Sequence, residues 1–369
     1  MKTILLVAGG RQGSLMLAPL YHSLKHRGGY RPVPVVALPE GELQITGDLA
    51  ACFGMEGEVQ TLFLQEGSAA GETAAAMTGL EKIIIAEAPS VVMICGSGNA
   101  AMAAAVTAAK LGFPVASADA GLRSYDRREW GEINRMVIDT VADFHFVSEH
   151  SGEYNLINEG VADEQLFFAG NLVIDSLAGL MPEASRLGVR AALGVEPKHY
   201  AMVLLGRPEE CIEKGYLEML LRLFTEISTG TTLLMPLSSG MDAAMKKFGL
   251  HTAFASLSGL RMVAPQSYMA LLPLLKDSSF VITDADEIQP EATVMNVPCL
   301  TMSESTSRPS TIEIGTNVLV GEDEEEILSR VHDILHAGDH ADSPRRSKIP
   351  EKWDGAAAAR IVDVLDRIL

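Results

Sequence analysis

The chain has 369 residues, 47% of them hydrophobic, and its 29 basic against 48 acidic residues give a net charge of −19 at pH 7. This length allows two domains that each bury a core. A charge this negative disfavours nucleic acid and anionic membrane surfaces as partners, and we predict neither. An anionic ligand must therefore be held by local cations or helix ends.

The sequence offers little sign of export or of a metal centre. The N-terminal apolar run is shorter than that of a secretory signal, and no run of about 20 apolar residues follows, so we predict a cytoplasmic protein. The four cysteines are widely spaced and form no CxxC pair, so we expect buried free thiols and predict no metal and no cofactor. They are Cys52, Cys95, Cys211 and Cys299.

Short apolar runs alternate with longer amphipathic or alanine-rich segments through the first half. Continuous apolar strands separated by helices indicate a parallel sheet covered on both faces. The predicted strands are 4–8, 33–38, 59–64, 91–95, 113–116 and 144–147, and the predicted helices are 14–26, 72–87, 99–111 and one beginning near Glu132.

The same alternation starts again near Tyr200, which predicts a second Rossmann-like half. Its predicted strands are 202–205, 233–235, 261–264, 280–283, 299–302 and 318–320. The fold class is therefore α/β, with two doubly wound domains and a cleft at the carboxyl ends of their sheets. We place the first domain at 1–180, a second domain of nucleotide-binding type at 195–350, and a helix that crosses back to the first domain at 351–369. The acids of GEDEEEI, 321–327, we interpret as the first turn of a helix, where they complement its dipole.

Five segments, in order along the chain, resemble the non-hydrolysing UDP-N-acetylglucosamine 2-epimerases. They are GGRQGSLMLAPL (9–20), ADAGLRSYD through GEINR (118–135), AGNLVID (169–175), TDADEIQPEA (283–292) and TSRP (306–309). The resemblance spans nearly the whole chain. It implies the family's GT-B fold, a small-molecule ligand such as a nucleotide sugar, and a homodimer.

Members of that family are understood to remove the proton at C2 of the sugar while UDP leaves, and to return both on the other face. This chemistry needs carboxylates for proton transfer. The first family acid falls on Asp119, which is one methylene shorter than glutamate. The second falls on Gly131 and the third on Ser97, so Glu132 is the remaining nearby acid. The resemblance thus implies catalytic roles for Asp119, Glu132 and Arg135.

The resemblance also implies a set of ligand-binding residues. Four family arginines are kept, and each can hold a phosphate or carboxylate through paired N–H groups. A family histidine is replaced by Arg207. The implied ligand-binding residues are Arg11, Ser97, Arg123, Arg207, Gln289, Glu291 and Arg308.

The turn that cradles the UDP phosphates in the family is changed. Its Ser-Gly-Gly, which lets backbone N–H groups approach the phosphates, is here Ala285, Asp286 and Glu287. We predict that the two acids cap the following helix, so that this helix supplies its own anion and UDP binds poorly. The family's allosteric segment has no counterpart at residues 39–42, so we predict no regulation by a second nucleotide sugar.

Three functions remain open from the sequence. The chain is a working epimerase that uses Asp119, Glu132 and the arginines; or a diverged enzyme acting on another sugar or a less anionic ligand; or an inactive homologue with a binding or regulatory role.

Overall fold

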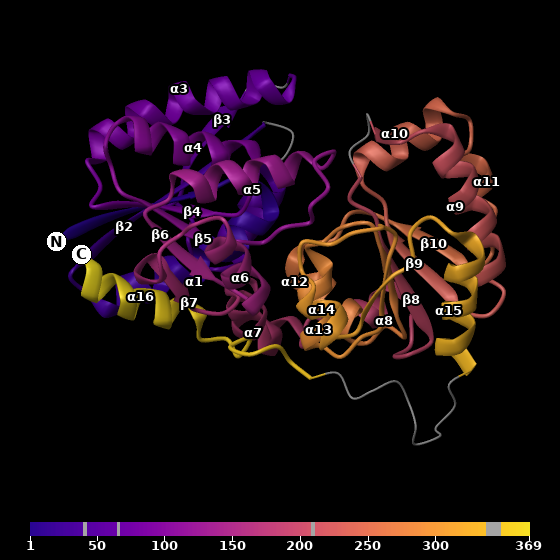
Figure 1. Ribbon diagram of the computed structural model, residues 1–369. Helices are drawn as coiled ribbons and strands as arrows, with labels where there is room; N and C mark the ends of the chain where they lie inside the picture. The colour runs from indigo at the N-terminus through magenta and orange to yellow at the C-terminus, as the bar shows by residue number, and fades with distance from the viewer. Residues whose placement is uncertain (40–42, 65–66, 208–210, 337–347) are drawn as a thin grey trace. The chain divides into compact units, whose positions relative to one another are not determined.

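The computed structural model describes residues 1–39, 43–64, 67–207, 211–336 and 348–369. The chain forms two compact units, residues 1–180 with 350–369 and residues 181–349 (Figure 1). Each unit is a parallel sheet covered by helices on both faces, which confirms the predicted α/β fold class. Within the described ranges, no helix has the length and apolar character needed to cross a membrane.

The first unit is a seven-stranded sheet in the order β3-β2-β1-β4-β5-β6-β7. Its order reverses between β1 and β4, which is where doubly wound sheets bind ligands at the carboxyl ends of their strands. Its elements are β1 (Lys2–Ala8), α1 (Gly10–Arg27), β2 (Tyr30–Pro39), α2 (Leu43–Cys52), β3 (Gln60–Leu64), α3 (Ala69–Glu87), β4 (Val91–Cys95), α4 (Asn99–Lys110), β5 (Val115–Ala118), α5 (Trp130–Val141), β6 (Phe144–Val147), α6 (His150–Asn158), β7 (Leu166–Phe168) and α7 (Leu172–Ala184).

The predicted strands of this unit are confirmed with small shifts. β4 and β6 match to the residue, whereas β5 begins two residues later than predicted, because the N–H of Phe113 closes the end of α4 on Ala108 instead of joining the sheet. The prediction missed β7, a half-buried edge strand of three residues.

The second unit is a six-stranded sheet in the order β10-β9-β8-β11-β12-β13, and its order reverses between β8 and β11. Its elements are α8 (Val189–Leu193), β8 (Tyr200–Leu204), α9 (Lys214–Ile227), β9 (Thr232–Pro236), α10 (Ser239–Lys247), α11 (His251–Ala255), β10 (Leu260–Val263), α12 (Tyr268–Lys276), β11 (Val281–Thr283), α13 (Ile288–Val294), β12 (Cys299–Thr301), α14 (Ser310–Glu313), β13 (Asn317–Leu319) and α15 (Glu324–His336).

Alternating residues of β8 show how this sheet is covered. Ala201 and Val203 pack into a core with α9, α10, α11 and α15, whereas Tyr200 and Met202 pack into another with α8, α12 and α13. Side chains alternate between the faces of a strand, so a continuous apolar run serves both cores. The first turn of α15 carries the predicted acids, and the Asp323 carboxylate accepts the N–H groups of Glu325 and Glu326.

The cysteines are free, as predicted, but they are not all buried. Cys95 and Cys299 lie at the ends of central strands and are buried, Cys52 is partly buried, and Cys211 is exposed. The prediction of burial is therefore wrong for Cys211, which lies in a loop between β8 and α9.

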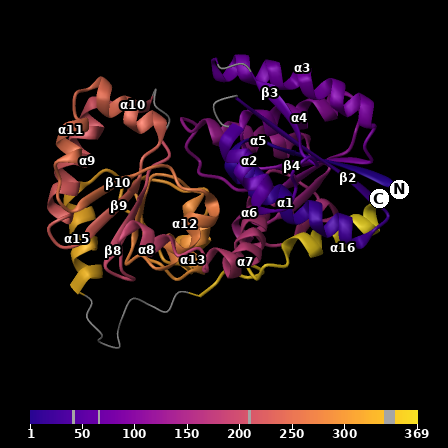
Figure 2. The same cartoon turned by 180° about the vertical axis from the view of Figure 1, so that it is seen from behind.

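The last helix, α16 (Ala357–Ile368), packs beside α1 in the first unit (Figure 2). Asp175 on α7 fixes its start, because the carboxylate accepts the N–H groups of Ala357 at 3.0 Å and Ala358 at 2.8 Å. Asp175 belongs to the AGNLVID segment. The structure therefore gives this acid the role of a helix cap supplied from another part of the chain.

Replacing Asp175 with alanine should lower the free energy of unfolding by about 2 to 4 kcal/mol, because two N–H groups at a largely buried helix start lose their acceptor. Urea denaturation measures this change. Asp163→Ala, at an exposed position of the same unit, is the matched control and should stay within about 0.5 kcal/mol of the original chain. Equal stabilities of the two variants would remove the capping role.

Candidate functional site

Ser97 and Asp119 follow the carboxyl ends of the neighbouring strands β4 and β5. Asp119 has a backbone φ of +58°, in the left-handed region. A side chain in this region costs on the order of 1 kcal/mol, and such strain gathers at functional sites. The turn that follows is fixed by Gly121, because a Cβ at this residue would lie 2.2 Å from the carbonyl oxygen of Gly152.

Arg123 is a structural residue in this turn. Its guanidinium donates to Asp139 at 2.7 Å, to both carboxylate oxygens of Glu159 at 2.9 and 2.7 Å, and to the carbonyl oxygen of Leu122 at 2.8 Å. Its side chain is only 1% exposed. The ligand-binding role of Arg123 stays a prediction, and these contacts weigh against it because they hold the guanidinium against Asp139 of α5 and Glu159 after α6.

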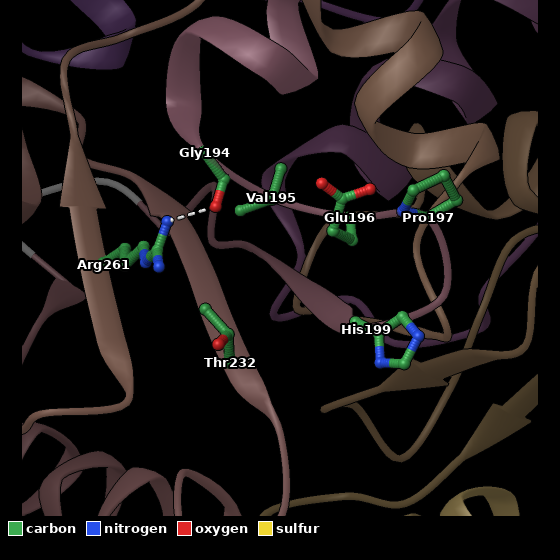
Figure 3. Close-up of a pocket in the computed structure, with 7 residues that line it drawn as sticks. All are labelled: Gly194, Val195, Glu196, Pro197, His199, Thr232 and Arg261. Carbon is green, nitrogen blue, oxygen red and sulfur yellow. Dashed lines mark hydrogen bonds between the residues drawn. The ribbon is translucent and has the colours of Figure 1, made fainter.

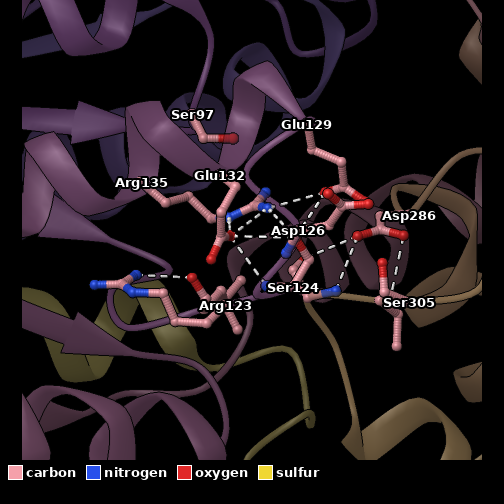
Figure 4. Close-up of polar contacts among 12 residues, drawn as sticks. Ser97, Arg123, Ser124, Asp126, Glu129, Glu132, Arg135, Asp286 and Ser305 are labelled. Atoms are coloured by element: carbon pink, nitrogen blue, oxygen red, sulfur yellow. Dashed lines mark hydrogen bonds and ion pairs between the residues drawn. The ribbon is translucent and has the colours of Figure 1, made fainter.

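Glu132 anchors the same turn from the first part of α5. Its carboxylate accepts the N–H groups of Ser124 at 3.0 Å and Tyr125 at 3.1 Å, and the guanidinium of Arg135 at 2.9 and 3.1 Å (Figure 4). Burial would raise the pKa of Glu132, but the Ser124 N–H and the Arg135 guanidinium outweigh it and lower the pKa.

The proton-transfer role of Glu132 stays a prediction, and its surroundings weigh against it. The side chain is 1% exposed, and its ionised form is stabilised by the Ser124 and Tyr125 N–H groups and the Arg135 guanidinium. A carboxylate held in this way neither takes nor gives a proton easily. We therefore assign Glu132 the role of positioning Arg135 and the turn.

Arg135 lies beside Ser97 and Gly131, the two positions at which the family resemblance implies an acid. Its side chain is 13% exposed. A Cβ placed on Gly131 would lie 3.5 Å from Arg135 Nη1 and 4.0 Å from Ser97 Oγ, so Ser97 and Gly131 face the same place beside Arg135. Asn134 fixes this arrangement by donating to the carbonyl oxygen of Ser97 at 2.9 Å.

Sequence reasoning missed one acid at this place. Glu129 precedes α5, and its carboxylate accepts the hydroxyl of Ser124 at 2.8 Å and contacts Arg135 Nη2 at 3.4 Å. Its position two residues before the vacated Gly131 is the signal that could have identified it.

In the second unit, Arg207 and Asp284 follow β8 and β11, the two strands at which the order reverses. The Asp284 carboxylate accepts the N–H of Gly206 at 2.6 Å and the hydroxyl of Tyr216 at 3.1 Å, and burial raises its pKa. Arg207 stacks on the Tyr216 ring at 3.9 Å and pairs with Glu322 at 2.8 Å. Arg207 is therefore a cation that is already paired. Residues 208–210 lie outside the described ranges.

The prediction that Asp286 and Glu287 cap α13 is wrong. Glu287 directly precedes the helix but makes no capping hydrogen bond. The Asp286 carboxylate turns instead to the 306–307 loop, where it accepts the N–H of Ser307 at 3.1 Å and its hydroxyl at 2.8 Å. The Asp286 carboxylate thus accepts hydrogen bonds from Ser307, and α13 has no side-chain cap. Ala285 donates its N–H to Thr283 Oγ1 at 3.0 Å.

Gln289 and Glu291, on α13, are buried. The Gln289 amide donates to Asp286 at 2.9 Å and accepts the hydroxyl of Thr306 at 2.7 Å. Glu291 accepts the hydroxyl of Tyr268 at 2.9 Å. Gln289 therefore extends the Asp286 network and has little capacity left for a ligand.

Two arginines complete the predicted set. Arg308 is also buried, and its N–H donates to Thr306 Oγ1 at 3.0 Å. Arg11 lies in the first turn of α1, directly after β1. The structure thus places Arg11, Ser97, Asp119 and Arg135 at the carboxyl edge of the first sheet, and Arg207, Asp286 and Arg308 at that of the second.

A cavity of about 520 Å³ lies elsewhere in the second unit (Figure 3). It is lined by Gly194, Val195, Glu196, Pro197, His199, Thr232 and Arg261. Residues 199 and 232 stand at the amino ends of β8 and β9, opposite the edge that carries Arg207 and Asp284. None of the predicted site residues lines this cavity.

Replacing Glu132 with glutamine should lower the free energy of unfolding by about 3 kcal/mol at pH 7, because it leaves Arg135 and two N–H groups without a charged acceptor. The pKa of Glu132 is lowered from 4.5, so its stabilising effect is full above that pH and is lost as the pH falls through the lowered pKa. Denaturation of the original chain and of Glu132→Gln between pH 7 and pH 3 should show that the difference between their free energies of unfolding shrinks. Glu81→Gln, exposed on α3, is the control, and a constant difference across this range would contradict the assignment.

Comparison with known proteins places this chain in a family. The family model described as UDP-N-acetylglucosamine 2-epimerase matches residues 53–366. The UDP-N-acetylglucosamine 2-epimerase of Methanococcus maripaludis is 30% identical over 291 residues, covering 77% of this chain and 79% of the relative. The UDP-2,3-diacetamido-2,3-dideoxy-D-glucuronate 2-epimerase of Pseudomonas aeruginosa is 30% identical over 260 residues, covering 68% and 70%.

A solved structure agrees with these relatives. The crystal structure of Methanocaldococcus jannaschii UDP-GlcNAc 2-epimerase in complex with UDP-GlcNAc and UDP superposes with a TM-score of 0.89 at 26% identity, covering 100% of both chains. The GT-B fold implied by the sequence motifs is thereby confirmed. This chain belongs to the UDP-N-acetylglucosamine 2-epimerase family.

Proposed function

We propose that this protein is a diverged isomerase or hydrolase of nucleotide sugars or sugars, with an altered phosphate turn and an incomplete set of family carboxylates. Two relatives support a shared reaction on differing substrates. Their names give 2-epimerisation of UDP-N-acetylglucosamine in one and of a UDP-diacetamido-dideoxyglucuronate in the other. A fold hosts new substrates by changes at the site.

The observation that carries the proposal is the position of Asp119. This carboxylate stands at the carboxyl end of β5 in a left-handed conformation, next to the loop that holds Ser97. The structure maintains its strain through the buried Arg123, Asp139 and Gly121 contacts. A base for a C–H proton must be held firmly, and these contacts provide that support.

Asp286 supports the change in the phosphate turn. A carboxylate about 4 Å from a diphosphate opposes binding by on the order of 4 kcal/mol at an effective dielectric of 20. Asp286 is partly exposed, so water screens part of this repulsion. Its contacts with Ser307 also occupy donors that an anionic ligand could otherwise use.

The proposed ligand set is accordingly narrower than the predicted one. In the first unit, Arg11 and Arg135 are proposed to bind a ligand, and in the second unit Arg308 is proposed to do so. Arg123 is left out because its donors are committed to Asp139 and Glu159. The homodimer and the cytoplasmic location remain predictions.

An inactive binding or regulatory protein is the second candidate. It is favoured by the two vacated acid positions, Ser97 and Gly131, and by the commitment of Glu132 to the turn. The residues at the carboxyl edge of each sheet would then serve binding alone.

Turnover in heavy water separates the two candidates. The protein is incubated in D₂O with UDP-N-acetylglucosamine, and separately with the UDP-diacetamido-dideoxyglucuronate of the relative. The enzyme hypothesis expects deuterium at C2 together with the epimer or the free sugar, detected by NMR. Asp119→Asn should lower the rate by on the order of a hundredfold or more. Absence of product from both substrates at high protein concentration would leave the binding protein as the better account.

Asp286→Asn should tighten the binding of UDP by about tenfold or more, because it removes a negative charge while keeping an acceptor for Ser307. Isothermal calorimetry measures the dissociation constant. Asp333→Asn, at an exposed position of α15, makes the same charge change elsewhere and should leave the affinity unchanged. Micromolar UDP binding by the original chain would contradict the electrostatic argument.

A further inference from the structure

Glu129 lies two residues before Gly131, the position at which the family resemblance implies an acid that this chain lacks. It directly precedes α5, in the turn closed by its own N–H on the carbonyl oxygen of Asp126 at 3.0 Å. Asp126 also accepts the N–H and guanidinium of Arg128, and these contacts lower its pKa to about 2. An ionised Asp126 therefore shapes the turn that delivers Glu129.

The Arg135 guanidinium lies close both to Glu129 and to Gly131. Arg135 Nη2 contacts the Glu129 carboxylate at 3.4 Å, while Nη1 lies 3.5 Å from the place of a Cβ on Gly131 (Figure 4). An acid at 131 and the acid at 129 would thus share one cation. With no side chain at Gly131, no acid from that position competes for this guanidinium.

Glu129 and Glu132 differ in exposure and in the length of their contact with Arg135. Glu132 is 1% exposed and accepts two backbone N–H groups as well as Arg135. Glu129 is 36% exposed, and its contact with Arg135 is longer, at 3.4 Å against 2.9 Å. A carboxylate that meets solvent and a cation can exchange a proton with a ligand, whereas one enclosed by donors cannot.

Glu129 is also held close to the loop at the end of β4. Asn134 of the same helix donates to the carbonyl oxygen of Ser97 and to Asn99 Oδ1, which ties the start of α5 to this loop. β4 and β5 are neighbours, so Asp119 follows the adjacent strand. Asp119 and the loop that is tied to the start of α5 therefore lie at the carboxyl ends of neighbouring strands.

We propose that Glu129 is the second proton-transfer carboxylate of this protein, acting with Asp119 in place of the acid absent at Gly131. The proposal rests on the proposed isomerase function. One carboxylate accepts the C–H proton at C2, the C–H electron pair becomes the second bond of a C1=C2 double bond, and the leaving group departs with the pair of its C1–O bond. On return, the other carboxylate gives its proton to C2, the oxygen re-forms the bond to C1, and solvent restores both protonation states.

Glu129→Gln tests the proposal, with Glu164→Gln at an exposed position outside the site as the matched control. With the two substrates named above, we expect kcat to fall by about a hundredfold or more while KM changes by less than about threefold. The melting temperature should stay unchanged. The control variant should keep its full rate.

A rescue experiment distinguishes catalysis from mere support of the turn. Adding Gly131→Glu to Glu129→Gln should restore the rate at least tenfold, because the new acid meets the same guanidinium. A variant that loses rate, melts earlier and is not rescued would overturn the proposal in favour of a positioning role.

Two further outcomes separate this proposal from the proposed function. If the original chain turns over either substrate and Glu129→Gln is equally fast, Glu129 has no catalytic role but the isomerase assignment stands. If the original chain turns over neither substrate, the isomerase assignment fails and the role of Glu129 fails with it.

Discussion

The candidate site depends on the buried carboxylate of Glu132, which accepts two backbone N–H groups and one guanidinium. It fixes the backbone after Arg123 and sets the direction of Arg135. A buried charge is tolerated only when its partners are complete, so this acid has a structural role although its position suggests chemistry. Arg123 forms a second group of ion pairs, with Asp139 and Glu159.

The two units differ in where their charged residues lie relative to the carboxyl edge of the sheet. In the first unit, ion pairs hold Arg123 to Asp139 and Glu159, and Arg135 to Glu132. In the second unit, acids occupy the edge itself: Asp284 binds Gly206 and Tyr216, and Asp286 binds the Ser307 loop. A protein with an overall charge of −19 thus places further acids where an anionic ligand would need donors. This distribution underlies the proposal of a changed ligand.

Several site assignments could be made from the sequence and others could not. Motif spacing was enough to place Ser97 and Asp119 at strand ends, because parallel strands deliver the following residues to one edge. It could not show that Arg123 and Glu132 are used up by Asp139, Glu159 and the 124–125 backbone. Those partners come from α5, α6 and the intervening turn. Glu129 was overlooked because it stands two residues before the motif position. Only the folded turn before α5 brings it beside Arg135.

The sequence by itself determined the two parallel sheets, since continuous apolar runs such as Val91–Cys95 can be buried on both faces only between two layers of helices. It also determined the family, through five ordered segments. Only the tertiary structure decided what each polar side chain does there. Asp286 accepts the N–H and hydroxyl of Ser307 as well as the side-chain amide of Gln289, and Asp175 caps a helix 182 residues away. Hydrogen-bond partners are set by distance in space, which a linear pattern of residue types does not encode.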